Sequence, residues 1–60
     1  MSYIKDIADA ILRIRSNSQF AVRGENESTV NETLTNCEIE WEEGETPISK
    51  TDIQTEIDNN

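Results

Sequence analysis

Residues 37–53, CEIEWEEGETPISKTDI, contain the change of periodicity that decides the fold. In the first part of this stretch apolar and acidic residues alternate strictly, which places Cys37, Ile39 and Trp41 on one face of a strand. The opposite face carries three glutamates that remain in solvent: Glu38, Glu40 and Glu42. The alternation therefore predicts a half-buried strand over about 37–41.

The second part of the same stretch has the residues that begin a helix. Ser49 is a good N-cap, and Asp52 three residues later completes a variant of the capping box. Ile48 precedes the cap and Ile53 occupies the fourth helical position, which is the spacing of a hydrophobic staple. We therefore expect a helix over about 50–58.

The N-terminal part of the chain predicts a second, amphipathic helix over about 3–15. Apolar residues recur there at the helical spacing of three and four: Ile4, Ile7, Ala8, Ile11, Leu12 and Ile14. Ser2 can cap the first turn. The sequence SNS that follows favours the end of this helix, because Ser and Asn compete for backbone hydrogen bonds.

Between the two helices lie a short strand and a polar connection. QFAVR, residues 19–23, alternates with Phe20 and Val22 on one face, which predicts a strand. Residues 24–36 are polar without a sustained period, and Val30 and Leu34 allow one helical turn there. We predict a single α+β domain over residues 1–60, with the order α-β-β-α and a two-stranded antiparallel sheet packed on one or two helices.

The small size of the chain suggests that it needs support from outside. It has 60 residues, of which 33% are hydrophobic. A domain of this size buries only about 60% of its unfolded surface, so ordering entropy nearly cancels the gain from burial. Cys37 is the only cysteine and histidine is absent, which excludes an internal disulfide and a Cys/His zinc site. We therefore expect oligomerisation or a protein partner.

The charge of the chain excludes several classes of partner. The net charge is −8, with +2 in residues 1–23 and −10 in residues 24–60. An acidic chain repels phosphate groups, so we expect no nucleic acid and no membrane as partner. No apolar run approaches the roughly 18 residues of a membrane span, and the N-terminus lacks the apolar segment of a signal peptide. One free cysteine is typical of a reducing, intracellular compartment.

The acidic residues do not form a pattern typical of catalysis or of metal binding. Carboxylates on one strand face are about 7 Å apart and diverge, whereas Ca²⁺ needs about six to eight converging oxygens. Cys37 has no histidine to activate it and is expected to pack as a small hydrophobe. We therefore expect no enzyme, no catalytic residue and no cofactor.

Several residues of this pattern resemble a known family. They lie between residues 9 and 57 and include Ala10, Ile11, Phe20, Arg23, Ile39, Trp41, Pro47 and Ile53. The order of these residues is similar to that in the small tailed-phage proteins of the XkdW type, and more loosely to a strand–Trp–Pro–helix module of tail-fibre assembly proteins. The resemblance implies a small α+β phage protein encoded among tail or structural genes. It supplies no catalytic residue.

The expected function is therefore protein–protein interaction through an exposed strand edge. The candidate interaction residues are Trp41, Glu38, Glu40, Glu42 and Arg23. Trp41 has two interpretations that the sequence leaves open, a ring that closes the core and an anchor for a partner.

Two functions follow from this expectation. The first is a virion or tail accessory or an assembly helper that pairs with a phage structural protein or with a second copy. The second is an acidic regulatory protein that redirects a host protein or enzyme. Both functions place the protein in the host bacterial cytoplasm, and the first also places it in the virion.

Overall fold

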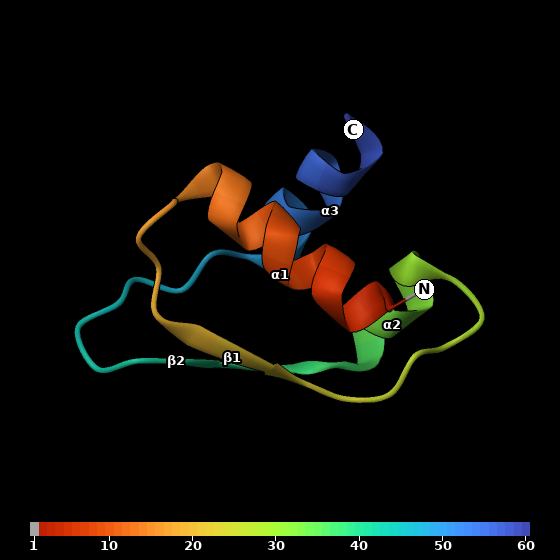
Figure 1. Ribbon diagram of the computed structural model, residues 1–60, viewed down its shortest axis with the longest axis horizontal. Helices are drawn as coiled ribbons and strands as arrows, with labels where there is room; N and C mark the ends of the chain where they lie inside the picture. The colour runs from red at the N-terminus through yellow and green to blue at the C-terminus, as the bar shows by residue number, and fades with distance from the viewer. Residues whose placement is uncertain (1) are drawn as a thin grey trace.

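The computed structural model describes residues 2–60 and contains three helices and a two-stranded antiparallel sheet. The elements follow the order α1 (Tyr3–Ile14), β1 (Phe20–Arg23), α2 (Val30–Asn36), β2 (Glu38–Trp41) and α3 (Lys50–Asp58). Figure 1 shows α1 above the sheet, α3 beyond α1, and α2 near the N-terminal end of α1. The helix α1 packs against β1 and against both other helices. The predicted α+β class and the antiparallel sheet are confirmed.

The first helix forms as its periodicity predicts. The Ser2 hydroxyl accepts a hydrogen bond from the Lys5 N–H at 3.2 Å, so it caps the first turn. Ile7 and Ile11 are completely buried. Leu12 and Ile14, expected on the same apolar face, are instead 40% exposed.

The two strands pair in the register Phe20–Trp41, Ala21–Glu40, Val22–Ile39 and Arg23–Glu38. Half-buried and exposed residues alternate along both strands, as the sequence predicts. The half-buried residues face the helices and the exposed residues face solvent. Ala21, Arg23, Glu38 and Glu40 therefore form one open face of the sheet.

The main correction to the expected fold is α2, which occupies the second half of the polar connection. We expected at most one helical turn there, but the structure has a helix of seven residues. The Thr29 hydroxyl accepts from the Glu32 N–H and caps it. Thr33 is completely buried, with its hydroxyl donating to the Thr29 carbonyl and accepting from the Glu27 N–H. A threonine thus contributes to the core, although it is polar in any hydrophobicity pattern.

The third helix begins as predicted. The Ser49 hydroxyl accepts from the Asp52 N–H at 3.1 Å. Ile48 and Ile53 are both buried in the core, so the hydrophobic staple is confirmed. Lys50 at the start of this helix donates to the carbonyl of Cys37 at 2.6 Å.

The core between these elements is small. Among residues 2–60 the buried apolar side chains are Ile7, Ala10, Ile11, Leu34, Cys37, Ile48 and Ile53. The residues on the inner face of the sheet are only partly buried against this cluster. No helix in the described part of the chain combines the length and the apolar character that crossing a bilayer requires.

Candidate interaction surface

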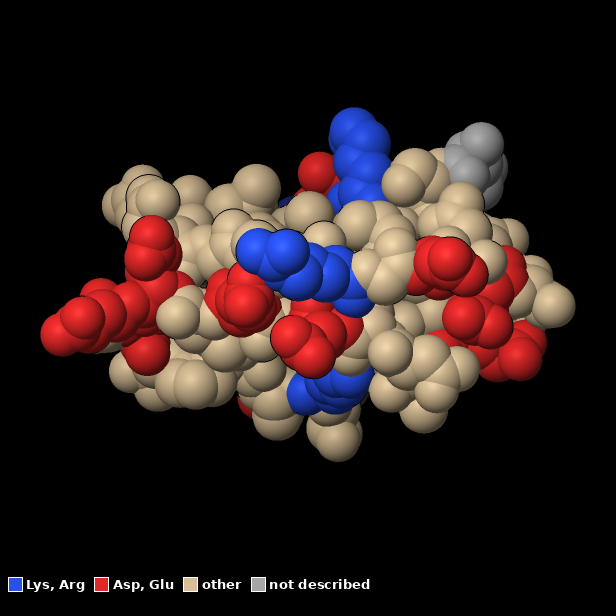
Figure 2. Space-filling view, turned by 90° about the horizontal axis from the view of Figure 1, so that it is seen from below, with Lys and Arg blue, Asp and Glu red and all other residues tan. Residues whose placement is uncertain are grey.

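The open face of the sheet carries the residues predicted to interact, and we call it the strand face. It comprises the outward side chains of the two strands and of the residues that flank them: Gln19, Ala21, Arg23, Glu38, Glu40 and Glu42. A shallow depression of about 430 Å³ lies here and also reaches Phe20 and Trp41. Figure 2 shows this side of the molecule, with acidic side chains at both ends and with basic and acidic side chains together near the middle.

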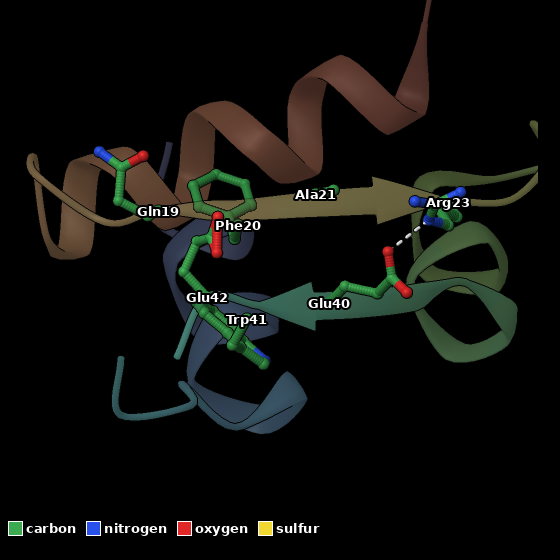
Figure 3. A pocket seen from close by; sticks show the side chains of 7 residues that line it. All are labelled: Gln19, Phe20, Ala21, Arg23, Glu40, Trp41 and Glu42. Atoms are coloured by element: carbon green, nitrogen blue, oxygen red, sulfur yellow. Dashed lines mark hydrogen bonds and ion pairs between the residues drawn. The ribbon is translucent and has the colours of Figure 1, made fainter. Parts of the chain in front are cut away.

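An ion pair occupies the middle of the strand face. Arg23 Nε lies 2.6 Å from Glu40 Oε1, and Figure 3 shows the two side chains turned toward each other across the sheet. Both side chains are more than half exposed, at 67% and 51%. Exposed pairs of this kind stabilise a fold by less than about 1 kcal/mol, because water screens them and both side chains lose rotamer freedom. The pair therefore orients Arg23 more than it holds the sheet together.

The other two predicted glutamates of this face, Glu38 and Glu42, are exposed and form no ion pair within residues 2–60. Glu38 lies opposite Arg23 in the register, but the guanidinium of Arg23 binds Glu40 on the diagonal. The strand face thus has negative charges without compensation on both sides of its central ion pair.

Trp41 takes part in the core and also keeps some of its surface exposed. Its ring packs at a centroid distance of 5.7 Å from Phe20, tilted by 43°, and it contacts the core cluster. The residue is nevertheless only half-buried. Figure 3 shows its side chain pointing away from β1. The ring therefore covers part of the core and also presents apolar surface beside β2, while its role as an anchor stays a prediction.

The positions of the hydrogen-bonded pairs between β1 and β2 show which backbone N–H and C=O groups point to the open edges of the sheet. Glu42 N–H donates to the Gln19 carbonyl at 3.0 Å, which makes this pair a hydrogen-bonded one. Hydrogen-bonded and non-hydrogen-bonded pairs alternate in an antiparallel sheet. The groups that turn outward to the two edges therefore belong to Phe20 and Val22 on β1 and to Ile39 and Trp41 on β2. Within residues 2–60 no backbone or side-chain hydrogen bond is made to these outward N–H and C=O groups.

Glu45, whose role the sequence pattern did not indicate, anchors the loop after β2. One of its carboxylate oxygens binds Arg15 at 2.9 Å, and the other accepts from the Gln19 N–H at 2.9 Å. Arg15 also donates to the Thr46 carbonyl. The only signal in the sequence was Arg15, directly after the first helix. It did not indicate a contact with Glu45, 30 residues later in the chain.

The acidic side chains and Cys37 are the residues that the sequence offers as possible ligands or nucleophiles. Among residues 2–60, no three His, Cys, Asp or Glu side chains converge as metal ligands. Cys37 is buried and its Sγ donates to the Leu34 carbonyl at 3.3 Å, which agrees with the predicted packing role. The strand face can therefore offer backbone hydrogen bonds, negative charge and one indole ring.

Comparison of the chain with protein families, with curated proteins and with solved structures finds no match. The resemblance to the XkdW-type phage proteins therefore stays a prediction. Function has to be argued from the geometry of the sheet and the charges around it.

Proposed function

We propose that the chain is a phage-encoded, non-enzymatic interaction protein, a small virion or tail accessory or an assembly helper, that acts through an exposed strand edge of its sheet. The observation that carries the proposal is the open edge of β2, where the outward backbone groups of Ile39 and Trp41 lie beside a half-buried indole. Such an edge pairs readily with another chain. The phage setting is supported by the family resemblance alone.

The energetics of the fold support a need for a partner. A two-stranded sheet is marginal by itself in water, and here the helices cover only one of its faces. The residues on that inner face, Phe20, Val22, Ile39 and Trp41, are only partly buried. A partner strand would extend the sheet and remove more of this apolar surface from water.

The test is recovery of the protein and its partner from infected cells. We expect the protein in purified virions or in assembly intermediates, together with one phage structural protein that is captured by the wild type and lost with Trp41→Ala. Tyr3→Ala is the matched control, since it removes a half-buried aromatic ring from α1, away from the sheet. A folded monomer that enters no particle and captures no phage protein would contradict the proposal.

The second candidate is an acidic regulatory protein that redirects a host enzyme in the bacterial cytoplasm. The observation in its favour is the excess of acidic side chains, 13 against five basic ones, which can mimic a phosphate-rich ligand. Capture of one host enzyme from uninfected lysate, with loss of that enzyme's activity and absence of the protein from virions, would favour this candidate over the first.

A further inference from the structure

Every basic side chain of the protein is already engaged within the chain. Four form ion pairs at 2.6 to 2.9 Å, namely Lys5–Asp9, Arg13–Glu56, Arg15–Glu45 and Arg23–Glu40. The fifth, Lys50, donates to the carbonyls of Thr35 and Cys37. Of the 13 acidic side chains, four are in these pairs, which leaves nine without an ion pair in the described chain. Residues 2–60 thus offer negative charge and no basic side chain without a partner.

A second copy of the chain is therefore a poor match for the β2 edge. Two β2 strands side by side would bring glutamates of the two copies together, and like charges directly opposite destabilise a sheet. The β1 edge of another copy offers only Arg23, which is paired with its own Glu40. A different chain with unpaired basic side chains is therefore the better source of positive charge.

The β2 edge has a distinct chemistry on each of its two sides. On the outer side Glu38 and Glu42 are exposed and lack ion-pair partners among residues 2–60. On the inner side Ile39 and Trp41 are half-buried and apolar. The backbone groups of these two inner residues turn outward and set the positions of the hydrogen bonds to an added strand. Side chains of that strand would alternate between the two sides.

We propose that the β2 edge binds an extended segment of another protein in which basic residues alternate with apolar ones, as a third strand of the sheet. This inference rests on the proposed function and adds the chemistry of the partner. Basic side chains of the segment lie over Glu38 and Glu42 on the outer side. Its apolar side chains extend the surface formed by Ile39 and Trp41 on the inner side.

The direct test titrates the full chain with a blocked hexapeptide, Lys-Val-Lys-Val-Lys-Val. Trp41 is the only tryptophan and lies on β2, so its fluorescence reports binding at this edge, and calorimetry supplies the affinity. We expect saturable one-to-one binding that weakens with salt. The matching hexapeptide with glutamate in place of lysine should not bind. Absence of binding by the lysine peptide, or equal binding by both peptides, would overturn the inference.

Two double variants separate a specific site from general charge attraction. The variant E38Q/E42Q should weaken binding at least about fivefold, since two cross-strand charge pairs are lost. The variant E27Q/D58N changes the net charge equally, at two exposed positions outside the sheet, and should leave the affinity within about twofold. Circular dichroism checks that both variants are folded. Equal weakening in the two variants would refute the site.

Amide hydrogen exchange distinguishes strand addition from binding to the carboxylates alone. The N–H groups of Ile39 and Trp41 should exchange more slowly when the hexapeptide is bound, because the added strand accepts them. Binding without this protection would refute edge pairing. If Trp41→Ala loses a virion partner in the earlier test but the hexapeptide does not bind, the proposed function stands and this inference fails. If the hexapeptide binds as expected but no partner is found in cells, this inference stands and the proposed function fails.

Discussion

Gly24, directly after β1, shows how one residue without a side chain lets two segments meet. Its φ is +152°, in a region that residues with a Cβ rarely adopt. A Cβ added here would lie 3.3 Å from both Cα and Cβ of Cys37. Cys37 is buried and connects α2 to β2, so it has little freedom to move away. The chain therefore needs glycine at this position for two independent reasons.

We expect Gly24→Ala to lower the free energy of unfolding by about 1–3 kcal/mol, from backbone strain and the close contact together. Urea denaturation measures the change. Gly44→Ala is the control, because Gly44 also has a positive φ, of +91°, but has nothing within 4 Å of an added Cβ. The free energy of unfolding should fall less with Gly44→Ala than with Gly24→Ala. Equal losses would show that the approach to Cys37 contributes nothing.

Two buried hydroxyls make opposite contributions. The Ser18 hydroxyl is buried and has no hydrogen-bond partner among residues 2–60, whereas the Thr33 hydroxyl makes two hydrogen bonds of 2.8 Å. Ser18→Ala should therefore leave stability unchanged or raise it by up to about 1 kcal/mol. Thr33→Val should lower it by about 1–3 kcal/mol, since the Glu27 N–H loses its acceptor. A clear loss of stability with Ser18→Ala would contradict this account.

Among the elements, α2 depends most on its cap. It has seven residues, and isolated helices of this length are unstable in water. Thr29→Ala should lower the free energy of unfolding by about 1 kcal/mol, because the Glu32 N–H loses its acceptor. Chemical denaturation followed by circular dichroism gives the value. Ser28→Ala, one residue earlier and exposed, should change stability by less than about 0.5 kcal/mol.

Most elements could be predicted from the sequence because periodicity or capping residues specify them locally. The helices α1 and α3 and both strands have such patterns, and they lie within a residue of the expected bounds. The helix α2 has only Val30 and Leu34 as large apolar residues. Its position in the core depends on hydrogen bonds of Thr33, which appear only when Thr29 and Glu27 are brought together.

At the scale of the whole molecule, unpaired negative charge dominates the electrostatics. Glu38, Glu42 and Glu43 lie close along the chain, and none has an ion pair in the described structure. Moderate salt weakens such repulsion, since the screening length falls to about 10 Å at 0.1 M ionic strength. We therefore expect the melting temperature to rise between low and physiological ionic strength, as measured by differential scanning calorimetry. A fall in the melting temperature with added salt would mean that the four ion pairs stabilise the fold by more than the repulsion destabilises it.

The composition of the strand face could also be predicted, but its internal pairing could not. Alternation alone places Glu38, Glu40 and Glu42 on the solvent side, and the structure confirms that placement. The link between Arg23 and Glu40 depends on the strand register, which the 14 residues from Gly24 to Cys37 set through α2. Alternation in each strand fixes which face is buried, but it does not say which residue of β1 lies opposite which residue of β2.

The contact between the first and last helices has a consequence for how the molecule opens. Arg13 binds Glu56 at 2.8 Å, and Ile53 packs in the same cluster as Ile7 and Ile11. If α3 detached, a core of this size would lose too much to keep the remaining segments folded. Unfolding should therefore be one cooperative transition, and the slowest-exchanging amides of α1 and α3 should report the same opening free energy. Detachment of either terminal helix would thus unfold the entire chain.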